Sequence, residues 1–226
     1  MSSKTLQLIA PSFIHPLCML LNLSIATNTF PDKWKVGQVK PLHKGGQHRE
    51  RNNYRPISVP PILSKIIEKH VANSLLKYLQ ENNLLYELQS AFRSGHSTET
   101  ALIRITDEIL FKMDSDGGTG LVFVDFRKAF DVITHNLLLV KKLSVYVASP
   151  DSVAWFRSYL EERQQFVELG HITSELRPVR QGVPQGSILG PILFLLFVND
   201  MPLHLNNSTI DIPPYPLVQT GIISLL

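Results

Sequence analysis

Hydrophobic and polar residues repeat along this 226-residue chain with spacings that predict both helices and strands. The strongest helical pattern follows Pro61, where apolar residues recur every four positions from Leu63 to Leu79 and polar residues lie on the other side. This spacing is typical of an amphipathic helix with one buried face. Apolar periodicity and capping residues predict further helices at 11–26, 98–113, 136–145, 149–161 and 188–198.

Shorter apolar runs between glycine- and asparagine-rich breakers predict strands. Extended segments, including a hairpin around Gly170, are predicted at 35–44, 52–58, 165–169 and 176–179. Four consecutive apolar residues, Leu121–Val124, follow the breaker run 114–118 and indicate a strand buried on both faces. Helices and strands are mixed along the chain, which indicates an α+β fold.

The strand at Leu121–Val124 is followed directly by the carboxylate of Asp125. A buried strand can hold such a carboxylate rigidly, and hard divalent cations prefer oxygen ligands. The ordinary alternative is an aspartate that caps the next turn. From these residues alone, the capping interpretation is favoured.

The basic residues are concentrated in one part of the chain. The net charge is only +3, but between Lys33 and Lys69 six lysines and three arginines stand against two glutamates, a local net charge of +7. Much of this segment is predicted loop, which favours a ligand-facing patch over a solvated helix face. Lys44 and Arg55 flank a turn between two predicted strands, where they could contact phosphate, Arg55 in a bidentate manner.

The sequence carries no convincing secretion or membrane signal. Cys18 is the only cysteine, so no intrachain disulfide is possible. The apolar run 17–26 is interrupted by Asn22, and the run 188–198 is shorter than the ~20 residues that span a bilayer. We expect an intracellular protein, nuclear or cytoplasmic, that is not secreted and has no membrane partner.

A glycine-rich turn, Arg180–Ser187, precedes the most apolar predicted helix. Gly182 and Gly186 would let the backbone approach a ligand closely, and Ser187 can cap the helix that follows. Gln185 lies between them. Alone, this turn is a weak indication of a binding site.

Six stretches, in this order, resemble the reverse transcriptase domain of non-LTR (LINE-type, Jockey-like) retrotransposons. Two are similar to fingers motifs, one to the loop before the palm, two to polymerase motifs A and B, and one to the end of the helix after motif B. They are Phe30–Gly45, Asn53–Lys69, Gln89–Thr98, Gly120–Asp131, Arg180–Pro191 and Phe197–Pro202.

The resemblance implies a right-hand polymerase: an α+β fold with fingers and an incomplete palm, in which helices pack on an antiparallel sheet, and no thumb. It divides the chain into an N-terminal helical lead-in (1–30), fingers (31–119), a partial palm with motifs A and B (120–212), and a tail outside the family pattern that we expect to be disordered (213–226).

The resemblance also implies a two-metal mechanism of nucleotidyl transfer. Asp125 would bind both Mg²⁺ ions and would be the catalytic residue, and the Phe126 carbonyl would help to bind one of them. Phe130 would lie under the sugar of the incoming nucleotide and exclude a 2′-OH; the alternative is a core residue. Asp131 is expected to cap the next helix rather than bind metal.

Residues of the fingers and of motif B are implied to bind the nucleotide. Lys44 and Arg55 would neutralise the triphosphate, and Gln185 would contact the nucleotide or the template base. Gly182 and Gly186 would permit this approach. The partners implied are an RNA template, a DNA primer and a dNTP; the oligomeric state is not indicated.

The chain departs from the family pattern where motif C, a Tyr-Ala-Asp-Asp turn, is expected after Ile212. It contains no Asp-Asp pair, and no acidic residue follows Asp211. Motif C would supply the remaining metal-binding carboxylates, so we expect this chain alone to be inactive. A frameshift or a mis-spliced gene would explain the loss of the pattern.

Two other interpretations remain open. The chain could be a non-catalytic protein that binds RNA or an RNA–DNA hybrid through the basic fingers. It could also be related to group II intron maturases, although its Gln89–Thr98 and Arg180–Ser187 stretches favour the LINE type.

Overall fold

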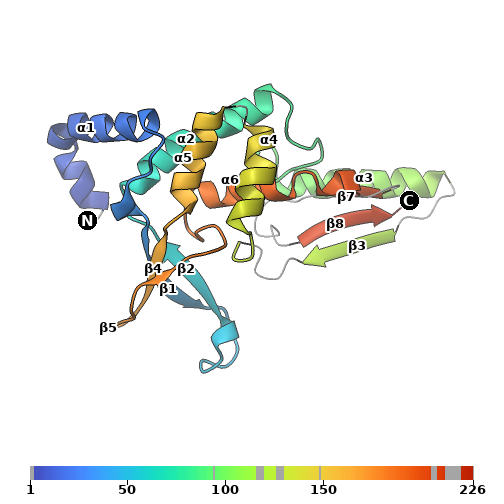
Figure 1. The fold of residues 1–226 in the computed structure, drawn as a ribbon. Coiled ribbons are helices and arrows are strands. Elements are labelled where there is room, and N and C mark those ends of the chain that lie inside the picture. Colours follow the sequence, from blue (N-terminus) through green and yellow to red (C-terminus); the bar gives the residue numbers. More distant parts are fainter. Residues whose placement is uncertain are drawn as a thin grey trace. The chain divides into compact units, whose positions relative to one another are not determined.

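The computed structural model describes residues 3–93, 95–115, 120–125, 130–147, 149–204, 208–211 and 220–225. The fold is α+β, as expected, and the chain forms two compact units (Figure 1). Unit 1 comprises Met1–Leu75 and Phe130–Gly190, and unit 2 comprises Leu76–Ala129 and Pro191–Leu226. Each unit is built from two separate stretches, whereas the division predicted from the sequence used contiguous ranges; that division stays a prediction.

The helical elements of unit 1 are α1 (Ser3–Ala26), the 3₁₀ turns η1 (Asp32–Trp34) and η2 (Arg51–Asn53), the π-helical η3 (Leu137–Leu143), α4 (Ser144–Tyr146) and α5 (Pro150–Leu160). Helices form in unit 1 at all three segments predicted there, but α1 begins at Ser3 rather than at residue 11, the predicted helix 136–145 is mostly π-helical, and the two 3₁₀ turns were not predicted. Pro150 occupies the first turn of α5, but Ser149 makes no side-chain capping bond. Helix α2 (Ser64–Glu81) begins in unit 1 and ends in unit 2, and so does α6 (Leu189–Val198).

The sheet of unit 1 joins two distant parts of the chain. Strand β1 (Val36–His43) pairs antiparallel with β2 (Tyr54–Val59) and parallel with β4 (Gln164–Leu169). The short strands β5 (Ile172–Thr173) and β6 (Arg177–Pro178) both pair antiparallel with β4, which gives the predicted hairpin around Gly170. In Figure 1, β1 lies between β2 and β4.

An aromatic cluster forms the core of unit 1 beside this sheet. Phe30 is fully buried and meets Trp34, Trp155 and Tyr159 edge-on, with ring centroids 6.0, 5.7 and 5.0 Å away. The guanidinium of Arg163, itself buried, lies 4.9 Å from the centroid of the Tyr159 ring and 5.8 Å from that of Phe30. Edge-on rings and a cation above a ring face both use the ring quadrupole, so this cluster is directional as well as apolar.

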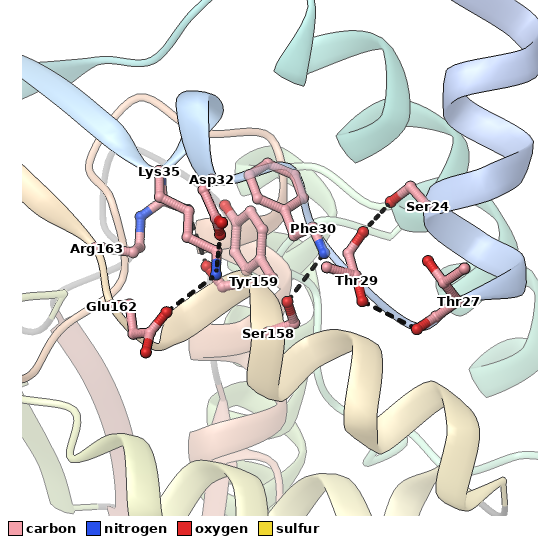
Figure 2. A network of polar contacts seen from close by, with 10 residues as sticks. All are labelled: Ser24, Thr27, Thr29, Phe30, Asp32, Lys35, Ser158, Tyr159, Glu162 and Arg163. Carbon is pink, nitrogen blue, oxygen red and sulfur yellow. Dashed lines mark hydrogen bonds and ion pairs between the residues drawn. The ribbon is translucent and has the colours of Figure 1, made fainter.

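Polar contacts fix the segment that carries Phe30 (Figure 2). The Phe30 N–H donates to Ser158 Oγ at 3.0 Å, and Ser24 Oγ donates to the Thr29 carbonyl at 2.6 Å. Lys35 is buried, yet its Nζ lies 3.0 Å from Asp32 Oδ1 and 3.9 Å from Glu162 Oε2. Both carboxylates are largely exposed, so the lysine charge is compensated at the surface rather than deep in the core.

Helix α1 is unusual in its exposure. By length and composition alone, Lys4–Ala26 is long and apolar enough to cross a bilayer, and 11% of its most apolar window is buried. One such helix is weak evidence for a membrane span, because core helices of soluble proteins and N-terminal signal sequences meet the same criteria of length and composition. Pro11 and Pro16 lie inside this helix.

In unit 2, three polar side chains hold the loop between α2 and helix α3 (Thr98–Asp114). Asn199, at the end of α6, accepts from the Tyr86 N–H and donates to the Leu84 carbonyl, both at 2.9 Å. Arg93 donates to the carbonyls of residues 86, 87 and 89, and Arg104 donates to the Leu88 carbonyl. Ser97 caps α3 and forms a reciprocal capping box with Thr100.

Unit 2 also contains a second sheet, of order β3–β8–β7, and the 3₁₀ turn η4 (Met201–His204). Strand β3 (Gly120–Asp125) pairs antiparallel with β8 (Thr220–Leu225), and β8 pairs antiparallel with β7 (Ser208–Asp211). Figure 1 shows β3 and β8 side by side. Strand β8 lies within the tail 213–226, and its backbone pairs along the edge of β3. The predicted disorder of that tail stays a prediction.

Replacing Phe30 by alanine should destabilise unit 1 by about 3–5 kcal/mol, because it removes a fully buried ring from a well-packed cluster. Urea unfolding followed by tryptophan fluorescence measures this, since Trp34 and Trp155 contact Phe30. The matched control is Val145→Ala, because Val145 is 75% exposed and its loss should change stability by less than ~0.5 kcal/mol. Equal effects of the two substitutions would contradict the assignment of this cluster as the core.

Candidate functional site

The glycine-rich turn is bound along one side by the segment that follows β3. The Gly182 N–H donates to the Ile133 carbonyl at 2.7 Å, and the Val183 N–H donates to the Phe130 carbonyl at 2.8 Å. Gln181 and Thr134 form an isolated antiparallel bridge. His135 Nε2 lies 2.7 Å from the Gly182 carbonyl and donates to it, because a carbonyl only accepts.

On its other side the turn contacts strand β2. The Ser58 N–H donates to the Gln185 carbonyl at 2.7 Å. Gly186 has a φ of +109° and approaches β2 so closely that a Cβ would overlap the Ser58 carbonyl oxygen. Gly182 has a φ of +85°, and a Cβ there would lie 2.8 Å from the Phe130 carbonyl oxygen. Only glycine combines such φ values with backbone approach this close.

The end of the turn is fixed where helix α6 begins. Ser187 Oγ accepts from the Gly190 N–H at 2.9 Å, which confirms the predicted cap. A second cap comes from α2: Glu68, fully buried, accepts from the Ile188 N–H at 2.8 Å through Oε2. A carboxylate at the positive end of a helix is stabilised by the orphan N–H groups and the helix dipole.

Glu68 is the buried acid of this region. Burial raises its pKa above the ordinary value of 4.5, and the Ile188 hydrogen bond and the charge of Arg163 oppose that rise. Burial likewise raises the pKa of Tyr159 well above its ordinary value of 10.0. The Tyr159 hydroxyl lies near Glu68 and Ser187, but it makes no hydrogen bond of normal distance and angle with a described residue.

A cleft of ≈ 310 Å³ lies in unit 1 between the turn and the sheet. Its walls are Gly37, Val39, Pro56 and Ser58 of β1 and β2, Asp131, the stretch 163–165, and the stretch 178–185. Arg163 and Arg180 contribute positive charge, and glutamines 164, 165, 181 and 185 contribute amides. This lining combines donors and acceptors with valine and proline side chains, and it suits a polar ligand with hydrogen-bonding groups on several sides.

The structure brings some of the predicted nucleotide-binding residues together. Gln185 lines the cleft, Gly182 and Gly186 shape the turn, and Phe130 is held against the turn by its carbonyl. Lys44 and Arg55 do not line the cleft. The pairing of Leu42 with Arg55, and the bond from the Lys44 N–H to the Asn53 carbonyl, place them on the face of β1–β2 opposite to Val39 and Ser58. Both are exposed.

The predicted metal site cannot be assembled from the described residues. Asp125 ends strand β3, as expected, but only its backbone is described, and Phe126 lies outside the described residues. Within the described part of the chain, no group of three or more His, Cys, Asp or Glu side chains could hold a metal ion.

Two acidic residues of this region, Asp131 and Glu68, make contacts that the sequence did not indicate. Asp131 was expected to cap the following helix, but η3 begins later, with Asn136 at its N-cap position and no side-chain capping bond. Asp131 Oδ1 instead accepts from Gln185 Nε2 at 3.0 Å. Glu68 falls in the buried stripe of α2 with Ser64, Leu75 and Leu79, and an acid at such a position was the available signal for it.

The fold and the turn-and-sheet arrangement define a polymerase-like domain. Telomerase from Candida tropicalis, solved with a fragment of telomeric RNA, superimposes with a TM-score of 0.60 at 14% identity, covering 95% of this chain and 40% of that one. At this identity the likeness concerns the fold alone.

The sequence comparisons are more specific. The profile of the reverse transcriptase (RNA-dependent DNA polymerase) family matches residues 42–217. A probable RNA-directed DNA polymerase from transposon BS of Drosophila melanogaster is 36% identical over 201 residues, and the polymerase from the mobile element jockey of the same organism is 31% identical over 212 residues. These alignments cover 88% and 93% of this chain, but only 22% and 23% of those proteins.

The chain therefore belongs to the reverse transcriptase family and is a reverse transcriptase domain of the non-LTR retrotransposon type. It spans about a fifth of the length of the relatives that it matches. Members of this family generally use divalent metal ions.

Replacing Gly186 by alanine should displace the turn from β2, because the new Cβ would overlap the Ser58 carbonyl. Gly45→Ala is a matched control: Gly45 has a similar φ of +116° but no atom within 4 Å of its Cβ position. Both variants carry backbone strain, and Gly186→Ala should lose a further ~1–3 kcal/mol in denaturant unfolding from overpacking. Equal losses would show that the close approach is absent in solution.

Replacing Glu68 by glutamine should flatten the pH dependence of stability. Because the folded-state pKa of Glu68 is raised, its contribution is fully present below 4.5 and is lost as the pH rises through the folded value. The unmodified chain should thus lose unfolding free energy between pH 4.5 and neutral pH, and Glu68→Gln should lose less. Glu81→Gln, at a side chain 63% exposed, is the control and should keep the original slope.

Proposed function

We propose that this domain carries out RNA-directed DNA synthesis as part of a longer retrotransposon protein, with an RNA template, a DNA primer and a dNTP as substrates. The observation that carries the proposal is the cleft of unit 1. Residues 54 positions apart in the sequence, Asp131 and Gln185, meet in its wall through a hydrogen bond, and the family match spans both.

The cleft supplies the binding part of this function. Gln185 offers an amide, Ser58 and the other glutamines offer further hydrogen bonds, and Arg163 and Arg180 give the positive charge that a nucleotide phosphate requires. Phosphoryl transfer is catalysed mainly by positioning and by neutralising charge, so a rigid turn beside a polar cleft is suited to hold one reactant.

The chain alone is proposed to be inactive in DNA synthesis. The family mechanism needs several carboxylates around two cations, and Asp125 is the only motif A carboxylate that the resemblance assigns to them. The sequence offers no Asp-Asp pair, and no acidic residue follows Asp211. One carboxylate cannot hold two cations against their mutual repulsion.

A second candidate function is non-catalytic binding of an RNA–DNA hybrid. It is favoured by the exposed fingers face that carries Lys44 and Arg55, neither of which forms an ion pair with a described residue. Free cations on one strand pair are available to successive phosphates. An intracellular site of action, nuclear or cytoplasmic, is proposed because both functions need nucleic acid.

Primer extension on an RNA template, with Mg²⁺ and dNTPs, tests the predicted inactivity. We expect no product above background from the purified chain. Extension that disappears in Asp125→Ala would overturn the prediction.

Binding of a labelled RNA–DNA hybrid, measured against salt concentration, tests the interface. The Lys44→Ala and Arg55→Ala variants should each bind more weakly and lower the salt slope by about one unit, because each removes one phosphate contact. Arg157→Ala is the control, since Arg157 is half-exposed on α5 and paired with Glu161. If neither fingers variant differs from the control, this face does not bind nucleic acid.

A further inference from the structure

Gln185 projects from a turn whose backbone is already fixed. The turn is held by backbone hydrogen bonds to Phe130 and Ile133 on one side and to Ser58 on the other. Ile133 and Val183, which take part in this ladder or flank it, are almost fully buried. The Cα of Gln185 therefore has a defined position, but its long side chain has three rotatable bonds and needs a further contact to be oriented.

The Asp131 carboxylate provides that contact. Its Oδ1 lies 3.0 Å from Gln185 Nε2, and both residues are half-buried and line the cleft. An ionised carboxylate only accepts hydrogen bonds, so it selects the amide nitrogen of Gln185 and rejects the amide oxygen. This choice settles the orientation of the amide group, which would otherwise be free to turn over.

Asp131 lies in a segment whose backbone is fixed by hydrogen bonds. Its neighbours Phe130 and Ile133 accept hydrogen bonds from Val183 and Gly182, and the Thr134–Gln181 bridge and the His135–Gly182 bond extend the same ladder. The carboxylate thus arrives at Gln185 from a preorganised segment. The carboxylate takes no part in these ladder bonds, so its role can be tested separately from them.

We propose that Asp131 is a positioning residue that orients the Gln185 amide, so that Gln185 Oε1 meets a hydrogen-bond donor of the bound nucleotide. No described residue donates to this oxygen, and Gln185 lines the cleft. The group recognised is an N–H or O–H of the base or sugar, not a phosphate oxygen, which only accepts. The proposal rests on the proposed function insofar as the ligand is a nucleotide.

A double-mutant cycle tests this role. A fluorescent dATP analogue is titrated into the full chain with an RNA template, a chain-terminated primer and Mg²⁺, for the unmodified protein, Asp131→Ala, Gln185→Ala and the double variant. If Asp131 affects nucleotide binding by orienting Gln185, Asp131→Ala should weaken binding about tenfold and should have no further effect in the Gln185→Ala background. Additive losses would overturn the proposal.

Two variants separate positioning from structure. Asp131→Asn keeps an acceptor oxygen and should restore most of the affinity lost in Asp131→Ala. Asp151→Ala is the matched control, because Asp151 Oδ1 accepts a similar 3.0 Å bond from Asn28 Nδ2 away from the cleft. Failure of Asp131→Asn to restore binding, or an equal loss in Asp151→Ala, would count against the proposal.

A measurement without ligand distinguishes the orientation of Gln185 by Asp131 from the binding of a nucleotide by the cleft. With ¹⁵N-labelled glutamine, the side-chain NH₂ signals of Gln185, assigned by their loss in Gln185→Ala, should shift in Asp131→Ala and stay in place in Asp151→Ala. Unchanged signals in Asp131→Ala would overturn the positioning role even if nucleotide binds. Shifted signals with no nucleotide binding by the unmodified chain would support the orientation by Asp131 and overturn the nucleotide as its purpose.

Discussion

The close approach of two backbones at Gly186 and Ser58 is the constraint on which the candidate site depends. No Cβ fits between the turn and β2, and a similar restriction holds at Gly182 against Phe130 and Asp131. The turn is therefore held between two segments by main-chain contacts that no side-chain motion can relax. Both ends of the turn are fixed as a result. The Gly182 and Val183 N–H groups donate to the carbonyls of Ile133 and Phe130 at one end, and α6 begins at the other end. The same segments line the cleft of unit 1.

Buried charges surround this site, and each is compensated in a different way. Lys35 is paired with exposed carboxylates, and Glu68 accepts from the N–H of Ile188, the residue just before α6. Arg163 lies over the Tyr159 and Phe30 rings and donates to the Tyr159 carbonyl. Burying a charge is costly, and a paired buried charge is weak evidence for added stability. We interpret these groups as fixing the relative register of α2, α5 and the turn, since each bond is satisfied in one arrangement only.

The residues that the resemblance assigns to nucleotide chemistry are divided between the two compact units. Phe130, Gln185, Lys44 and Arg55 belong to unit 1, whereas Asp125 belongs to unit 2, where β3 pairs with β8. Recognition of a ligand by the cleft can thus be studied separately from the metal chemistry assigned to Asp125. Strand β8 pairs along the edge of β3, the strand that ends at Asp125.

Much of the local structure was determined by the sequence. Period-four apolar spacing specified α2, short apolar runs specified β1 and β3, and the glycines at 182 and 186 marked the turn, because these signals act over a few neighbouring residues. The family could also be inferred from the motifs. The tertiary structure alone decided that β1 pairs in parallel with β4 and that Glu68 caps α6 from 120 residues away. It also decided that Asp131 binds Gln185 rather than a helix end. Finally, it placed Lys44 and Arg55 on the face away from the cleft. These are choices among many possible long-range partners, and no local pattern distinguishes one carboxylate acceptor or one strand edge from another.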